Sequence, residues 1–281
     1  MKTGIIKPGK IIYVIFTYLL RFGWLYILII PMWFTLTGAF KVNESLATIP
    51  YKWLPQEPSL ENFRKLIFEF SILNYLKNSV IVTVISVALQ SFVSAMAGYG
   101  FGRMKFPGRD KLFLASSLVM MVPFSALMIP LFIEMKVLGW VGNFLPLIVP
   151  PALTYAYGVF IFRQFIKGIP HEYEESAYID GCGSFQIFLR IILPLVKPAY
   201  ISVVILGSLG FWNDYQAPLI FLNEQSMYTA QLALGFFRSR FVSNYTMSLA
   251  AVVVTVIPIL MIFLFLQKYF IASFTHSGVK G

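Results

Sequence analysis

Residues Pro170 to Pro194 read Pro-His-Glu-Tyr-Glu-Glu-Ser-Ala-Tyr-Ile-Asp-Gly-Cys-Gly-Ser-Phe-Gln-Ile-Phe-Leu-Arg-Ile-Ile-Leu-Pro. Four of the chain's 12 acidic residues lie between Glu172 and Asp180. The pattern predicts a helix with Pro170 in its first turn and its carboxylates at the positive end of the helix dipole. Gly181 and Gly183 then break that helix, and Ser184 caps a second helix that ends near Pro194. We expect this pair of helices to lie across a membrane surface.

The rest of the chain is strongly apolar. Of its 281 residues, 58% are hydrophobic and only 12% are charged, and the apolar residues form long uninterrupted runs. Such runs are typical of helices surrounded by lipid. The sequence therefore predicts an all-α integral membrane protein, with a single membrane domain over residues 1–281. Its six transmembrane helices are expected at about 14–40, 78–102, 112–133, 142–162, 198–222 and 245–267.

The start of the first span is ambiguous because Arg21 interrupts its apolar run. One interpretation is a single long tilted helix from which Arg21 reaches the membrane surface. The other is a surface helix up to Leu20, with the span beginning near Gly23. Because no small-residue cleavage site follows the first apolar run, we expect a retained span rather than a removed signal peptide.

The net charge of +10 does not indicate nucleic-acid binding, because the basic residues lie between the apolar runs. The single cysteine, Cys182, excludes an internal disulfide. His171 and His276 are far apart in the sequence, and no metal-ligand cluster or catalytic constellation is visible. We therefore expect neither a metal site nor an enzyme active site in this chain.

The distribution of Lys and Arg predicts the orientation. If the N-terminus is cytoplasmic, 14 of the 22 basic residues lie inside and 22 − 14 = 8 lie outside. The positive-inside rule favours this arrangement, with both termini and residues 170–194 in the cytoplasm. The inside residues are Lys2, Lys7, Lys10, Arg21, Arg103, Lys105, Arg109, Lys111, Arg163, Lys167, Arg190, Lys197, Lys268 and Lys280.

The acidic stretch also resembles a known motif. The spacing of Glu175-Ser176-Ala177, Gly181 and Ile191-Ile192-Leu193-Pro194 resembles the EAA loop of ABC importer permeases, with Ser176 and Cys182 in place of alanines. Tyr99 to Arg109, Phe162 to Phe165 and the C-terminal Gly278 to Gly281 are similar to the MalG-like permeases of carbohydrate importers. The alternative is an ordinary amphipathic connector on the membrane surface.

The resemblance implies a binding-protein-dependent importer subunit in a bacterial or archaeal cytoplasmic membrane. Its partners would be a second homologous permease, two copies of a cytoplasmic ATPase and an extracellular or periplasmic solute-binding protein. ATP and Mg would be bound by the ATPase subunits and no cofactor by this chain, which has no Walker lysine motif. The residues expected to dock into the ATPase are Glu172, Glu174, Glu175, Ser176, Ala177, Asp180, Gly181 and Ile187.

The fifth predicted span carries polar residues within an apolar run: Trp212, Asn213, Asp214 and Gln216. A carboxylate at membrane depth usually faces a cavity or a partner group. One interpretation is a polar wall of a sugar path. The other is a structural lock, in which Asp214 accepts hydrogen bonds from a neighbouring helix or from an unwound turn before Pro218.

Two outer segments complete the prediction. Residues 58–63 predict a turn and a short helix, with Ser59 as a possible cap. The last outer loop, residues 224–245, contains candidates for contact with a binding protein, or alternatively for an interfacial aromatic and basic belt. These residues are Phe236, Phe237, Arg238 and Arg240.

The resemblance favours import of a carbohydrate, with an oligosaccharide as the expected substrate. A permease for another solute, such as a polyol phosphate, remains an alternative. A self-sufficient secondary carrier would need ionisable groups at the membrane midplane, and only Asp214 is available for such a role. A membrane scaffold would leave both Asp214 and the acidic loop unexplained.

Overall fold

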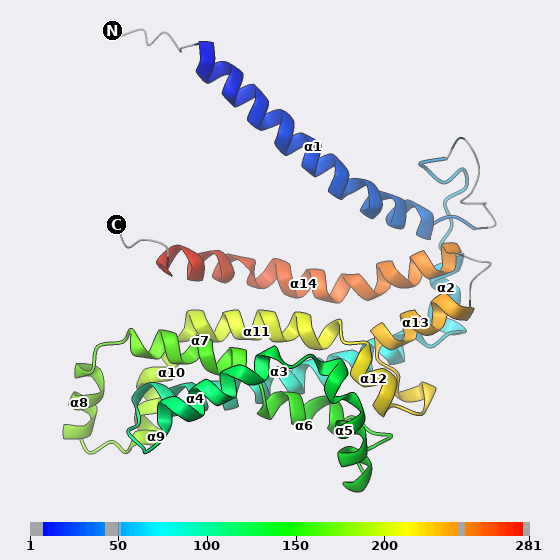
Figure 1. The fold of residues 1–281 in the computed structure, drawn as a ribbon. Coiled ribbons are helices and arrows are strands. Elements are labelled where there is room, and N and C mark those ends of the chain that lie inside the picture. Colours follow the sequence, from blue (N-terminus) through cyan, green and yellow to red (C-terminus); the bar gives the residue numbers. More distant parts are fainter. Residues whose placement is uncertain (1–7, 43–49, 51, 241–244, 278–281) are drawn as a thin grey trace. The chain divides into compact units, whose positions relative to one another are not determined.

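A computed structural model describes residues 8–42, 50, 52–240 and 245–277 of the chain (Figure 1). Every regular element in these ranges is helical, and no strand occurs among them. The helices are α1 (Pro8–Ala39), α2 (Glu61–Phe68), α3 (Ile72–Arg103), α4 (Arg109–Leu118), η1 (Val119–Met121), α5 (Phe124–Val137), α6 (Leu145–Leu153), α7 (Ala156–Lys167), α8 (Glu172–Ile179), α9 (Ser184–Ile187), η2 (Phe188–Ile192), α10 (Leu193–Leu195), α11 (Lys197–Trp212), α12 (Gln216–Phe221), η3 (Gln225–Met227), α13 (Ala230–Arg240) and α14 (Tyr245–Ser277).

Four helical stretches in the described part of the chain are long and apolar enough to cross a membrane. They are Tyr13–Ala39, Ile72–Arg103, Leu145–Lys167 and Tyr245–Phe265, and two strongly bent helix pairs raise the number to six if each pair is one span. The prediction of an all-α integral membrane protein is confirmed. Helix α1 is continuous through Arg21, as expected for one long first helix rather than a separate surface helix.

Two of the predicted spans are not straight helices. Residues 112–133 fall on the pair Arg109–Met121 and Phe124–Val137, which is bent by 103°. Pro123 explains the break, because a residue before proline disfavours the helical region, and Val122 is extended. Residues 198–222 are divided between α11 and α12, with a non-helical turn at 213–215. The second bent pair instead joins Ser184–Leu195 to Lys197–Trp212, at an angle of 80°.

The chain forms two compact units, and each is described by itself. In the unit of residues 1–70 and 237–254, the buried amide of Asn62 links α2 to the end of α1. Its Nδ2 donates to the carbonyl oxygens of Ala39 at 3.0 Å and Lys41 at 2.8 Å. The backbone N–H of Glu61 donates to Ser59 Oγ at 3.1 Å, but Leu60 rather than Ser59 directly precedes the short helix, so Ser59 is not its N-cap residue. A single domain over residues 1–281 stays a prediction.

The second unit, residues 71–236 and 255–281, is organised around α3. Helix α3 packs against α6, α7 and α11, which run beside it in Figure 1. The α3–α7 contact is close because Gly98 faces the backbone of α7 at Phe162 and Arg163. Small residues at such a position let two membrane helices approach each other. One apolar cluster joins α3, α7 and α11 to the segment containing α8 and α9.

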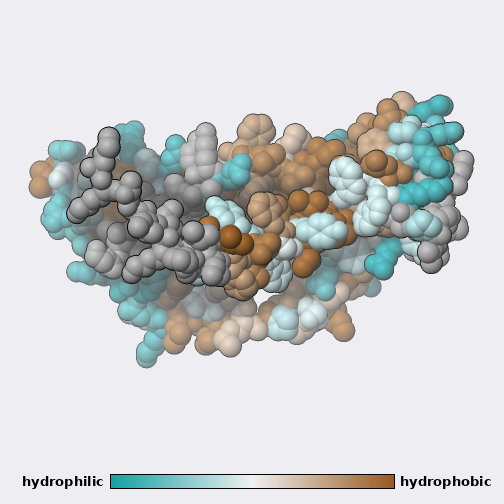
Figure 2. Space-filling view, turned by 90° about the horizontal axis from the view of Figure 1, so that it is seen from above, coloured by the Kyte–Doolittle hydropathy of each residue, from teal (hydrophilic) through white to brown (hydrophobic). Residues whose placement is uncertain are grey.

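The outward surfaces of the helices are largely apolar. On the face shown in Figure 2, hydrophobic side chains cover the middle portions of the helices, and hydrophilic side chains gather toward the ends. In α1, none of the most apolar 18-residue stretch is buried within the chain. Lipid, or the apolar surface of another membrane protein, is the natural surrounding for such helices.

Candidate functional site

The acidic stretch forms two short helices separated by a glycine turn. Helix α8 begins at Glu172 with His171 before it, so Pro170 precedes the helix rather than lying in its first turn. Gly181 has a φ of 81°, and the N–H of Cys182 donates to the carbonyl of Ala177 at 2.9 Å. This is the left-handed glycine end of a helix, for which a residue without a Cβ is suited.

The second helix of the stretch differs from the prediction in two details. Gly183, not Ser184, precedes α9, and its N–H donates to Gln186 Oε1 at 3.2 Å. The helix then continues through the wide π-helical turn η2 and ends at Leu195, one residue after the expected Pro194.

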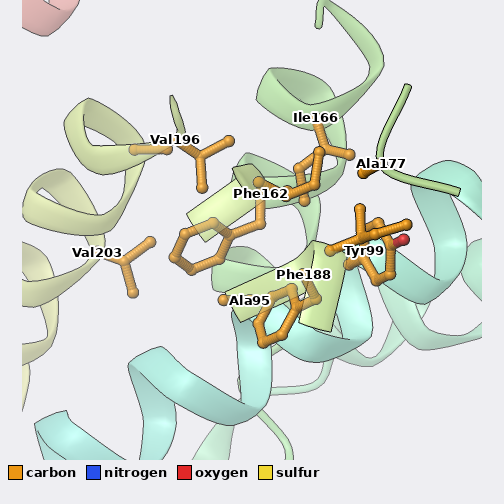
Figure 3. Packing of buried hydrophobic residues seen from close by; sticks show 11 residues of the cluster. Ala95, Tyr99, Phe162, Ile166, Ala177, Phe188, Val196 and Val203 are labelled. Atoms are coloured by element: carbon orange, nitrogen blue, oxygen red, sulfur yellow. The ribbon is translucent and has the colours of Figure 1, made fainter. Parts of the chain in front are cut away.

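The inward side of the stretch is apolar. Ala177 of α8 and Ile187 of α9 are buried in the cluster that contains Tyr99 of α3 and Phe162 and Ile166 of α7. Figure 3 shows Ala177 beside Ile166 and Tyr99, and the Phe162 ring directed toward the α11 side of the cluster. Two of the eight predicted docking residues therefore pack within this chain. They fix the position of α8 and are not part of its free surface.

Glu174 also faces inward. Its Oε1 lies 2.7 Å from Nε of Arg103, the last residue of α3, and the two side chains are only 8% and 4% exposed. The sequence predicts Glu174 as a docking residue, and the structure corrects this prediction. The carboxylate faces the bundle, and Arg103 compensates its charge inside the chain. The sequence does not reveal the pair, since Arg103 lies far from Glu174 along the chain.

The outward side of α8 presents the other predicted residues. Glu172, Glu175, Ser176, Asp180 and Gly181 are all exposed. Ile179, one helical turn after Glu175, is 87% exposed. Tyr173 of α8 and Phe185 of α9 are exposed as well. Sequence reasoning missed these three apolar side chains, although an isoleucine one turn after an exposed glutamate is a detectable signal.

The polar residues of the predicted fifth span have separate environments. Trp212 is buried, and its Nε1–H donates to the carbonyl of Thr255 at 3.2 Å. Asp214 Oδ1 accepts the N–H of Ala217 at 3.2 Å, so it caps α12 after the non-helical turn. This contact supports the structural interpretation of Asp214. Asn213 and Gln216 are exposed, and Asn213 Nδ2 donates to the carbonyl of Leu209 at 2.9 Å.

The predicted outer contact residues lie on helix α13 rather than in a loop. Phe237 is 1% exposed, and its ring lies edge-on to Phe70 at 5.9 Å, so it is not available for contact with a partner. Phe236 is half-buried beside Tyr228, whereas Arg238 is exposed. The side chain of Arg240 lies outside the described residues.

Potential metal ligands do not gather anywhere in the described part of the chain: no group of three or more His, Cys, Asp or Glu residues is close enough to hold an ion.

Residues 90–276 match the family described as "Binding-protein-dependent transport system inner membrane component", and the chain belongs to that family. It is an ABC transporter permease, and members of this family are permease subunits rather than enzymes.

Curated relatives agree over almost the whole length. The chain is 36% identical over 259 residues to the arabinooligosaccharides transport system permease protein AraQ of Bacillus subtilis (strain 168), covering 89% of this chain and 90% of the relative. It is 32% identical over 284 residues to the probable ABC transporter permease protein YurM of the same organism, covering 98% and 92%.

A solved structure shares the fold. It is described as a bacterial ABC transporter involved in the import of the acidic polysaccharide alginate. The TM-score is 0.82 at 20% sequence identity, and the match covers 95% of this chain and all of the matched chain.

Proposed function

We propose that this permease is the membrane-spanning subunit of a carbohydrate importer and that its substrate is an oligosaccharide. The observation that carries the proposal is the similarity to AraQ, which extends over 89% of the chain and whose name specifies arabino-oligosaccharides. The oligosaccharide would cross the membrane by alternating access, with the spans opening first to the outside and then to the cytoplasm.

In this proposal, α8 docks into a cytoplasmic ATPase present in two copies, which bind ATP and Mg. Three features support α8 as the docking element. Its outward side offers Glu172 and Glu175 to basic groups, Ile179 offers an apolar side chain to a pocket, and Ala177 fixes the helix to the bundle. Both termini and residues 170–194 then lie in the cytoplasm, as the distribution of basic residues predicts.

The complex would also contain a second permease subunit and an outer solute-binding protein. A second fold neighbour, with a TM-score of 0.67 at 14% identity, is described as an alginate ABC transporter in complex with an alginate pentasaccharide-bound periplasmic protein. Exposed Arg238 and half-buried Phe236 remain candidate contacts for such a protein. Arg240, whose side chain lies outside the described residues, remains a candidate from the sequence alone. Asn213 and Gln216 remain candidates for the sugar path because both are exposed.

Co-purification tests the docking proposal. The permease is expressed with its partners in membranes, and native, Glu175→Lys and Glu57→Lys forms are isolated through an affinity tag. Glu57 is an exposed carboxylate in the predicted outer segment, so its reversal is a matched control. We expect Glu175→Lys to lose the ATPase while still inserting, and Glu57→Lys to retain it. ATPase retention by Glu175→Lys would contradict docking through α8.

The substrate is tested separately, by measuring which solute the co-purified binding protein holds. We expect an oligosaccharide. A polyol phosphate or another non-sugar solute would overturn the substrate assignment without affecting the docking proposal.

A further inference from the structure

Arg103 occupies the junction between the central helix of its unit and the start of α8. It is the last residue of α3, and α3 packs against α6, α7 and α11. Although arginine is rarely buried without a partner, the Arg103 side chain is only 4% exposed. Its guanidinium therefore depends on acceptors supplied by the protein.

Those acceptors all come from the segment that leads into α8. Arg103 Nε lies 2.7 Å from Glu174 Oε1, and Nη1 lies 2.9 Å from Nε2 of His171. Nη2 donates to the carbonyl oxygen of Ile169. A planar guanidinium presents its donors in a fixed fork, so the hydrogen bonds of Nη1 and Nη2 orient the segment, and the ion pair from Nε holds Glu174 beside them.

No neighbouring group in the described part of the chain can take the place of either partner in the ion pair. The two atoms form an ion pair at 2.7 Å, and among the described residues neither Arg103 Nε nor Glu174 Oε1 has a hydrogen-bond partner. A buried charge that loses its partner is strongly destabilised, so each of these atoms depends on the other. Glu172 and Glu175 of the same helix are exposed and have no such dependence.

Tyr178 of α8 also interacts with the side chain of Tyr99 of α3. The apolar contact of α8 with the bundle is of a different kind. Ala177 touches the apolar cluster through a single methyl group. Apolar contact is non-directional, so it tolerates sliding of one surface over another. An ion pair held by a rigid fork does not tolerate sliding, because a shift of an ångström or two changes all three Arg103 contacts together.

We propose that Arg103 is a positioning residue that transmits movement of α8 to α3, with Glu174 as the group on which it acts. The inference rests on the proposed docking of α8 into an ATPase. A pull on α8 moves the end of α3 through the ion pair, and α3 moves with the helices packed against it. Glu174 thereby acts within the permease, where it helps to couple ATP hydrolysis to transport, and it does not contact the ATPase.

The test uses the assembled complex of permeases, ATPase and binding protein in lipid vesicles. Glu174→Ala breaks the pair, Glu174→Gln keeps its shape without the charge, and Arg103→Met/Glu174→Leu replaces it with apolar groups. Such apolar replacement of a buried ion pair is often neutral for stability. Glu57→Ala is the control, because it removes an exposed carboxylate that lies outside α8 and its proposed docking surface. Three quantities are measured: ATPase retained, basal ATP hydrolysis, and stimulation of hydrolysis by sugar-loaded binding protein.

We expect all variants that assemble to retain the ATPase and basal hydrolysis. Stimulation should fall about fivefold or more in Glu174→Ala, at the lower end of typical coupling effects, and less in Glu174→Gln. It should stay low in the apolar double variant, although a merely structural pair would be rescued by that replacement. Native stimulation in the double variant or in Glu174→Gln would overturn the inference. Loss of the ATPase from the Glu175→Lys complex tests docking independently, so the two failures are distinguishable.

Discussion

The close packing of α3 on α7 predicts that Gly98→Ala destabilises the protein. A Cβ at residue 98 would lie 2.5 Å from Phe162 Cβ, 3.1 Å from the backbone nitrogen of Arg163 and 3.3 Å from the carbonyl carbon of Phe162. Ordinary contact begins near 3.4 Å, so the shortest of these overlaps is 3.4 − 2.5 = 0.9 Å. The neighbouring atoms belong to the backbone or are attached directly to it, so relief requires the two helices to separate.

Gly100→Ala is the matched control. Gly100 lies two residues further along α3, and an added Cβ there meets nothing within 4 Å. Both substitutions gain the same helix propensity, about 1 kcal/mol, and this gain cancels when the two variants are compared. The difference in their free energies of unfolding is therefore the packing cost, about 1–3 kcal/mol for an extra methyl group in a well-packed interior.

Thermal unfolding of the two purified variants in the same detergent measures this difference. At about 2–4 °C per kcal/mol, Gly98→Ala should unfold at least about 2 °C below Gly100→Ala. Equal midpoints, or a higher midpoint for Gly98→Ala, would refute the close approach of α3 and α7.

Two further substitutions separate structural from functional roles. Asp214→Ala removes the carboxylate that accepts the Ala217 N–H, so thermal unfolding should show a loss of about 0.5–2 kcal/mol of stability. Asp214→Asn should preserve both stability and sugar uptake, because asparagine also caps helices. Loss of uptake in a stable Asp214→Asn variant would instead indicate a role in the sugar path. Asn62→Ala removes the two buried hydrogen bonds to the carbonyl oxygens of Ala39 and Lys41. The free energy of unfolding should therefore fall by about 1–3 kcal/mol. An unchanged unfolding midpoint would show that the amide does not hold α2 to the end of α1.

The spans were predictable because lipid imposes a simple requirement. Backbone polar groups in a bilayer must be paired within the segment, so a long apolar run in a membrane protein is helical. The same run says little about where the helix bends. The bend at Pro123 follows from a proline, but Pro31 and Pro258 lie within continuous helices, so proline alone does not specify a break.

The composition of α8 was predictable, but its orientation was not. Three carboxylates within four residues indicate a helix start, and each of them satisfies that pattern equally. Only the contact with Arg103 distinguishes Glu174 from Glu172 and Glu175, and that contact depends on how α3 and α8 meet in space. Phe237 illustrates the same limit, since burial against Phe70 and exposure to a partner both suit an aromatic side chain.

We propose that the exposed face of α8 lies in the cytoplasm and is covered by an ATPase. Labelling of a cysteine at residue 179 tests it most directly, because Ile179 is 87% exposed. Ile179→Cys is placed in a Cys182→Ser background, which removes the only natural cysteine. In intact cells, the account predicts labelling by a membrane-permeant thiol reagent but not by an impermeant one, and protection when the ATPase is co-expressed. Labelling by the impermeant reagent from outside, or equal labelling with and without the ATPase, would contradict it.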